Sequence, residues 1–245
     1  MSHPAPSPRL VALLRERTPL LVLTGAGVSR ESGIATFREA GGLWEGVDPT
    51  EVATPEAFAQ DPRRVWRFYD ARRRQGAQAK PNPAHRAIAS LEDTGRPFLL
   101  ATQNVDGLHE KAGSRSMVRL HGSLWRVRCI GCGDEWEDDR PSIEPLPPTC
   151  GCGAILRPAV VWFGEALPQQ AFAQAHAMAR RASLCLVVGT SALVYPAAAL
   201  PESALAAGAY VVEINPEPTP FSPFASEVLA GPAGEILPAL LEAAA

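Results

Sequence analysis

Four cysteines form the most regular chemical pattern in the sequence. Cys129 and Cys132 are separated by two residues, and after 17 intervening residues Cys150 and Cys152 are separated by one. Four thiolates in two close pairs are the ligands that Zn²⁺ takes in structural sites, and they leave no position for water. We therefore expect one structural zinc ion, with four unrelated buried cysteines as the alternative. Cys185, in an apolar run, is expected in the core.

A glycine turn follows the first apolar run of the chain. Residues 19–24 read as a strand buried on both faces, and Gly25 and Gly27 come directly after it. Such a turn lets the backbone approach a phosphate, although an ordinary tight turn explains it equally well. The dehydrogenase fingerprint is incomplete, because Arg30 occupies the third glycine position and no strand with an acidic end follows about 20 residues later.

Polar side chains follow a second apolar run, residues 97–102. Gln103, Asn104, Val105 and Asp106 come at the carboxyl end of this predicted strand, where open α/β sheets bind their ligands. These side chains suit a carboxamide or a sugar, whereas a polar turn is the simpler interpretation. His121 is available as a general base near neutral pH, but a lone histidine more often has a structural role.

The elements that position these residues follow an alternating pattern. Further apolar runs at 184–189 and 209–214 read as strands, and helical patterns precede the strands, such as 85–92 after the cap Asn82 and Pro83. The alternation predicts an α/β fold with a Rossmann-like, doubly wound parallel sheet.

Two insertions interrupt the alternation and predict a smaller zinc-binding and helical lobe. We expect residues 1–42, 81–125 and 158–245 to form the large domain, and residues 43–80 and 126–157 to supply the helical and zinc-binding modules of the small one.

Composition excludes several classes of protein. The chain has 245 residues, a net charge of −3 and 46% apolar residues, so it is globular and lacks the basic surplus of a general nucleic-acid binder. No apolar stretch approaches the roughly 18 residues of a membrane span, and the first residues carry no secretory pattern. We expect a cytoplasmic protein with reduced thiols and no membrane partner. The oligomeric state is left open, and a monomer is compatible with the sequence.

Taken in order, the motifs resemble those of the sirtuins, a family of NAD-dependent protein-lysine deacylases. The matching segments are GAGVS at 25–29, GIATFR at 33–38, TQNVDGLH at 102–109, HGS at 121–123, the cysteine pairs, LRP at 156–158, VWFGE at 161–165, GTS at 189–191 and NPE at 215–217. They span almost the whole chain from about residue 10 onward. Chance does not account for so many motifs matched in order.

The resemblance implies that NAD is a consumed co-substrate, bound in a cleft between the two domains. In the family, the acyl oxygen of a modified lysine attacks the ribose C1′ as nicotinamide leaves, and the products are free lysine, nicotinamide and O-acyl-ADP-ribose. His121 matches the general base, and Asn104 and Asp106 match residues that hold nicotinamide and ribose for attack. The NAD contacts carried over are Gly25, Ala26, Gly27, Ser29, Thr36, Phe37, Arg38, Trp44, Gln103, Asn104, Val105, Asp106, Gly189, Thr190, Ser191, Asn215, Glu217 and Ala233.

The implied partners are acyl-lysine proteins or peptides. The segment Val161, Trp162, Phe163, Gly164 and Glu165 resembles the strand that pairs with an extended substrate peptide. Tyr69 and Arg72 lie three apart, on one face of a predicted helix, and match the Tyr-x-x-Arg pair of sirtuins that remove succinyl and malonyl groups. The alternative is that Arg72 belongs to a solvated basic face together with Arg63, Arg64, Arg67, Arg73 and Arg74.

The sequence departs from the family at two places. Its second cysteine pair is Cys-x-Cys where Cys-x2-Cys is usual, and Arg30, expected to point away from NAD, replaces a small residue. Two other functions fit only part of this pattern. An NAD(P)-dependent oxidoreductase with a structural zinc leaves His121 and Gln103–Asp106 unexplained, and a zinc-ribbon module for nucleic acid is opposed by the acidic character of the cysteine segment.

Overall fold

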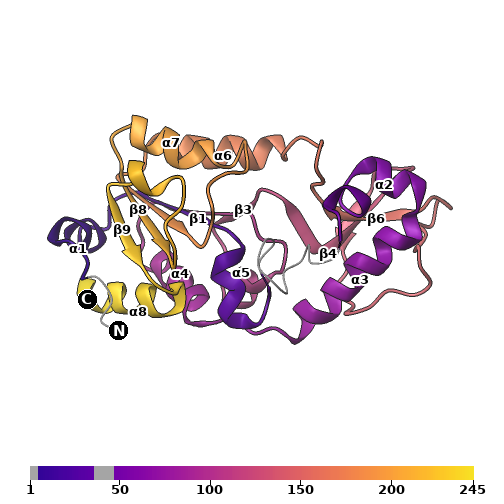
Figure 1. Ribbon diagram of the computed structural model, residues 1–245, viewed down its shortest axis with the longest axis horizontal. Coiled ribbons are helices and arrows are strands. Elements are labelled where there is room, and N and C mark those ends of the chain that lie inside the picture. The colour runs from indigo at the N-terminus through magenta and orange to yellow at the C-terminus, as the bar shows by residue number, and fades with distance from the viewer. Residues whose placement is uncertain (1–4, 36–46) are drawn as a thin grey trace.

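A six-stranded parallel sheet forms the centre of the larger lobe in the computed structural model, which describes residues 5–35 and 47–245 (Figure 1). The strands are β1 (Leu20–Thr24), β2 (Phe98–Thr102), β3 (Met117–Arg119), β7 (Leu184–Val188), β8 (Tyr210–Asn215) and β9 (Glu227–Ala230), in the order β3-β2-β1-β7-β8-β9. This is the strand order of the Rossmann fold, so the predicted fold class is confirmed.

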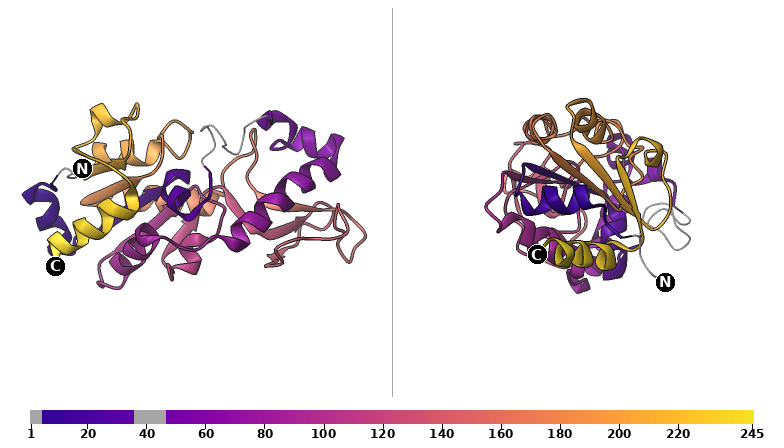
Figure 2. Two further views of the ribbon diagram at one scale, coloured as in Figure 1. Left: turned by 60° about the horizontal axis from the view of Figure 1, so that its bottom comes forward. Right: turned by 90° about the vertical axis from the view of Figure 1, so that its left-hand side faces the viewer.

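Helices cover both faces of the sheet. One layer contains α1 (Pro8–Arg15), α4 (Pro83–Glu92) and α8 (Ala233–Ala244), and the other contains α6 (Gln169–Ala179) and α7 (Ala199–Ala206) (Figures 1 and 2). Alternate residues of β1 pack into the two layers, with Leu20 and Val22 in the first and Leu21 and Leu23 in the second. Burial on both faces is the reason that this strand is a continuous apolar run.

The local signals of the sequence coincide with the element boundaries. Asn82 caps α4 through its side chain, which accepts from the N–H groups of Ala84 and His85, and Pro83 is the first helical residue, as predicted. The short strands β3 and β9 at the sheet edges were not predicted. No helix among the described residues is both long and apolar enough to cross a bilayer.

The smaller lobe joins two helices to an antiparallel sheet. The short 3₁₀ helix η2 (Pro49–Glu51), α2 (Pro55–Gln60) and α3 (Pro62–Gln78) come before it in sequence, and the sheet is formed by β4 (Gly122–Cys129), β5 (Glu135–Glu137) and β6 (Leu156–Val160), with β4 in the middle. Both insertions contribute to one core that includes Phe58, Trp66, Val127 and Ile143. The sheet extends beyond both ends of the predicted segment 126–157, and the domain boundaries stay a prediction.

Arg73 ties α3 to the cysteine-bearing segment. Its side chain is 1% exposed, and Nη2 lies 2.8 Å from Oδ1 of Asp138, which is also buried. The same guanidinium donates to the backbone carbonyls of Leu124, Asp138 and Arg140. A buried arginine with this many acceptors is fully satisfied, so it belongs to the packing of the lobe and not to a solvated basic face.

We expect Arg73→Met to lower the free energy of unfolding by about 3–5 kcal/mol, because it removes one of the two arginines that pair with the buried Asp138 carboxylate and leaves the carbonyls of Leu124 and Arg140 without this donor. Chemical denaturation measures the change. Arg67→Met, at an exposed position of the same helix, is the matched control and should stay within about 0.5 kcal/mol of the parent. Equal stabilities of the two variants would contradict the structural role of Arg73.

Candidate active site

A cleft of about 620 Å³ lies where β1, β2, β7 and β8 end, and the small lobe lines part of it. Most of the predicted site residues meet there. Those that line it are Gly25, Ala26, Gly27, Tyr69, Arg72, Gln103, Asn104, Val105, Asp106, His121, Val161, Trp162, Phe163, Gly164, Glu165, Gly189, Thr190, Ser191, Asn215 and Glu217. The cleft thus opens at the carboxyl edge of the parallel sheet, beside the small lobe.

Two glycine turns touch at the floor of this cleft. A Cβ on Gly27 would lie 2.8 Å from the backbone of Gly189, and a Cβ on Gly189 would lie 2.3 Å from the nitrogen of Val28. Gly189 also has a φ of +59°, which favours glycine. The turns after β1 and β7 therefore need glycine for their close approach, and the N–H of Gly27 donates to the backbone oxygen of Gly189 at 2.8 Å across that contact.

Ser29 organises the polar residues beneath the cleft. Its hydroxyl donates to Oδ2 of Asp106 at 2.7 Å and accepts from Nδ2 of Asn104 at 3.1 Å. Burial raises the pKa of Asp106. The hydrogen bonds from the N–H of Leu108 and the hydroxyl of Ser29 stabilise the carboxylate and oppose this effect. Among the described residues, Oδ1 of Asn104 is buried without a hydrogen-bond partner. A buried acceptor left open in a cleft fits a ligand with a donor, such as a carboxamide or a ribose hydroxyl.

His85 completes this cluster and was not predicted. Its Nδ1 accepts from the backbone N–H of Asn82, so Nε2 carries the proton and points to the hydroxyl of Ser29 at 3.3 Å. Burial lowers the pKa of His85 to about 4 and keeps the ring neutral. The signal available in the sequence was its place three residues after the helix cap, which indicates only a capping role.

His121 is half-buried and lines the cleft. Its Nδ1 lies 3.1 Å from the backbone oxygen of Gln103. Because a carbonyl oxygen only accepts, Nδ1 carries the proton and Nε2 is left as a base. Burial lowers the pKa of His121 and the bond to Gln103 partly opposes that effect. The neutral ring is therefore the dominant form near pH 7.

Tyr69 and Arg72 reach the same cleft from α3. The hydroxyl of Tyr69 accepts from Nε1 of Trp162 at 2.9 Å, and burial raises the pKa of the phenol, so it keeps its own proton to donate. The guanidinium of Arg72 lies over the ring of Phe68, 3.7 Å from its centroid. Stacking on an aromatic face limits the orientation of the guanidinium plane.

The predicted peptide-binding segment, residues 161–165, is not a strand. β6 ends at Val160, and the segment continues as a turn. Its N–H groups are already engaged: Val161 donates to His121, Phe163 to Ala53, and Trp162 to the carboxylate of Glu165. Glu165 in turn pairs with Arg157, and its own N–H donates to the backbone oxygen of Trp162 at 3.0 Å, so the turn is fixed at both ends.

Some predicted residues lie elsewhere. Ser29 lies behind the lining, and Ala233 is buried at the start of α8, beside Gly234, whose N–H donates to Glu31 at 2.8 Å. Thr36, Phe37, Arg38 and Trp44 lie outside the described residues. Arg30, expected to point away, lines the cleft. The lining residues that sequence reasoning missed include Gln75, Val194, Tyr195 and Thr219, of which Tyr195 is strongly exposed.

The four cysteines form one cluster in the small lobe. Their sulfur atoms all lie within 4.8 Å of one another, with 3.5 Å between Cys129 and Cys152 and 3.8 Å between Cys132 and Cys150. Four Zn–S bonds of about 2.3 Å at tetrahedral angles place sulfurs about 3.8 Å apart, so the set fits zinc. Backbone N–H groups of Cys132 and Gly131 lower the pKa of the Cys129 thiol, which favours the thiolate. The one-residue spacing of the second pair is accommodated.

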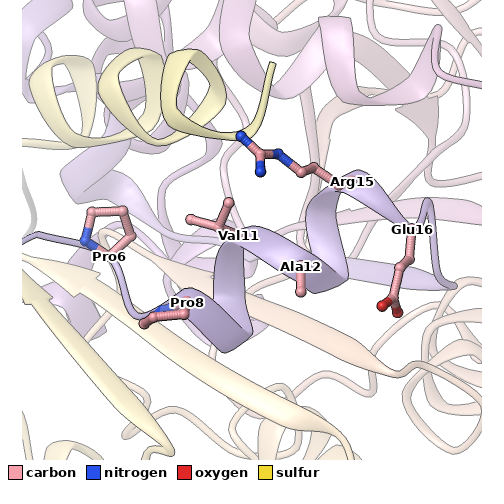
Figure 3. A pocket seen from close by; sticks show the side chains of 6 residues that line it. All are labelled: Pro6, Pro8, Val11, Ala12, Arg15 and Glu16. Carbon is pink, nitrogen blue, oxygen red and sulfur yellow. The ribbon is translucent and has the colours of Figure 1, made fainter.

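A second hollow, of about 490 Å³, lies on α1, at the opposite end of the molecule from the small lobe (Figures 1 and 3). Six residues line it: Pro6, Pro8, Val11, Ala12, Arg15 and Glu16. Arg15 turns toward α8, where it donates to the oxygen of Ala243, and Glu16 points the other way. Its two charged side chains, Arg15 and Glu16, thus point apart and do not converge on the hollow.

The fold and the cleft together define a class: a Rossmann-like nucleotide-binding protein with a small cysteine-bearing lobe. The model of the Sir2 family matches residues 25–196. An NAD-dependent protein deacylase 2 of Pyrobaculum aerophilum is 54% identical over 94% of this chain and 92% of its own length. The chain belongs to the Sir2 family and is an NAD-dependent protein deacylase.

Solved structures agree with this assignment. A complex of a Sir2 homologue with NAD is 45% identical, has a TM-score of 0.92 and covers 100% of this chain and 96% of its own. A Sir2 variant with a deacetylated p53 peptide and 3′-O-acetyl-ADP-ribose is 34% identical, with a TM-score of 0.87 and 96% of each chain covered.

We expect purified protein to contain one zinc ion per chain and Cys152→Ser to lose it, since three thiolates bind zinc less tightly than four. Because metal binding contributes to folding, the loss should lower the melting temperature by about 10 °C or more. Elemental analysis and thermal unfolding measure both effects. A metal-free variant that melts like the parent would exclude a structural zinc at this cluster.

Proposed function

We propose that this deacylase removes succinyl and malonyl groups, as well as acetyl groups, from protein lysines. The observation that carries the proposal is the position of Tyr69 and Arg72, which line the same cleft as His121. The products would be free lysine, nicotinamide and O-acyl-ADP-ribose, and the partners are acyl-lysine proteins or peptides. A cytoplasmic location supplies NAD and keeps the cysteines reduced.

The acyl selectivity follows from the chemistry of the two side chains. A succinyl or malonyl group ends in a carboxylate, which a guanidinium binds through two parallel N–H···O bonds. The stacked guanidinium of Arg72 is preorganised for that geometry, and partial burial limits its screening by water. The proton of Tyr69 adds one donor, since its oxygen is held by Trp162. An acetyl group offers no carboxylate and would use neither interaction.

The NAD site uses both glycine turns. We assign the phosphates to the backbone of Gly25–Gly27 and Gly189–Ser191, and the adenosine ribose to Asn215 and Glu217. When bound, NAD supplies the electrophilic ribose carbon that accepts the acyl oxygen. Asn104 and Asp106, fixed by Ser29, orient the nicotinamide and its ribose. We extend this site to Thr36, Phe37, Arg38, Trp44 and Ala233 on the family resemblance.

His121 is assigned as the general base. Its Nε2 is unprotonated because Nδ1 donates to Gln103, and it can take a proton from a ribose hydroxyl. The turn at 161–165, which begins where Val161 bonds to the backbone of His121, holds the substrate peptide beside this base. The acyl-lysine then enters between the base and the Tyr69–Arg72 pair.

A pH prediction follows from the His121 environment. Activity requires neutral His121 and is lost as pH falls through its pKa, so a lowered pKa places the acid limb of kcat/KM below pH 6.5. His121→Ala should reduce activity about 10²- to 10⁴-fold across the profile. Rates of formation of the deacylated peptide between pH 5 and 8 measure this. An acid limb above pH 6.5, or an active alanine variant, would contradict the assignment.

The acyl-group prediction uses Arg72→Met. We expect kcat/KM for a succinyl-lysine peptide to fall about 100-fold, the value of two lost charged hydrogen bonds, and that for an acetyl peptide to change less than about threefold. A panel of acetyl, malonyl, succinyl and glutaryl peptides measures it, with Arg67→Met as control. Equal losses of kcat/KM on acetyl and succinyl peptides would contradict the role of Arg72 in acyl selectivity. Formation of NADH instead of free nicotinamide would refute deacylation.

A further inference from the structure

Glu213 is a fully buried carboxylate in the middle of β8. It is 0% exposed and pairs in register with Val187 of β7 and Val228 of β9. A carboxylate in such a place is costly unless its oxygens are well bonded. It has no part in the reaction described above, and it was not among the predicted site residues.

Two hydroxyl groups from one loop satisfy this carboxylate. Thr219 donates to Oε1 and Ser222 donates to Oε2. Each hydroxyl also accepts a backbone N–H of the same loop: Phe221 donates to Thr219 at 3.1 Å, and Thr219 donates to Ser222 at 2.7 Å. The carboxylate thus orders the backbone through the two hydroxyls, in a closed set of hydrogen bonds.

The ordered loop is a wall of the cleft. Residues 215–219 all line it, and Phe221, 5% exposed, anchors the far end of the loop in the core beneath α7. At the near end, Nδ2 of Asn215 donates to the backbone oxygen of Thr190 at 3.0 Å. The wall is therefore fixed at both ends and, between them, by Glu213.

We propose that Glu213 is a positioning residue for the adenosine end of NAD. It does not touch the ligand and acts by holding the 215–219 wall in its binding conformation, so that ordering the loop costs less free energy when NAD binds. The proposal rests on the adenosine placement given under the proposed function. Glutamine at this position keeps the shape of the side chain but replaces one acceptor oxygen with an NH₂ donor. That NH₂ group then faces the hydroxyl of Thr219 or Ser222, which donates to the carboxylate in the parent.

The test is the affinity of Glu213→Gln for ADP-ribose, which binds without turnover and can be measured by titration calorimetry. We expect the Kd to rise about tenfold, with a similar rise in KM for NAD. The kcat and the KM for the acyl peptide should change less than about threefold, because the wall follows β8 of the large lobe whereas the turn at 161–165 follows β6 of the small lobe. An unchanged Kd in a folded variant would overturn the proposal.

Control variants separate the possible failures. Glu227→Gln makes the same change on β9, where the carboxylate binds Ser7 and Tyr210, and it should leave the ADP-ribose affinity unchanged. Thr219→Val should raise the Kd for ADP-ribose as Glu213→Gln does, whereas Thr219→Ser, which keeps the hydroxyl, should bind ADP-ribose like the parent. This pair of variants tests the proposal even if Glu213→Gln folds poorly. Asn215→Ala tests the placement itself: if it binds ADP-ribose normally, the assigned adenosine site is wrong. If it binds weakly while Glu213→Gln and Thr219→Val bind normally, Glu213 has no positioning role.

Discussion

The contact between the turns after β1 and β7 is the constraint on which the site depends. These strands are neighbours in the sheet, and the chain leaves them in opposite directions, which opens the crevice where ligands bind in open α/β folds. Gly27 and Gly189 let the turns touch, and no other residue type fits there. Thr190 is then held from both sides, by Gln103 and by Asn215, so the polar ends of β2 and β8 are fixed to the same point.

Buried polar groups around the cleft share a common arrangement. Hydroxyl groups stand between a carboxylate and other donors: Ser29 for Asp106, and Thr219 and Ser222 for Glu213. Each hydroxyl both donates and accepts, so one small side chain fixes two partners. Such networks are rigid when every member is satisfied, and the open oxygen of Asn104 is then a specific place for a ligand.

Much of the fold and of the site could be predicted from the sequence, because the central strands are continuous apolar runs and the ligand-binding turns follow them directly. The short edge strands β3 and β9 lack such a run. Contacts that depend on tertiary packing also could not be predicted from the sequence. Tyr69 and Trp162 are 93 residues apart, and no local pattern indicates their hydrogen bond. Arg73 looked like its exposed neighbours, and only the packing of α3 against β4 explains its burial.

The three hydrophobic cores support different parts of the cleft. The two glycine turns follow strands that pack in the two cores of the parallel sheet, whereas Tyr69 and Trp162 belong to the separate core of the small lobe. Substitutions at Tyr69 and its neighbours on α3 should therefore change this part of the cleft without repacking the parallel sheet. Under the proposed function, a change of acyl preference would then need only a few substitutions on one helix, while the glycine turns at the edge of the parallel sheet stay as they are.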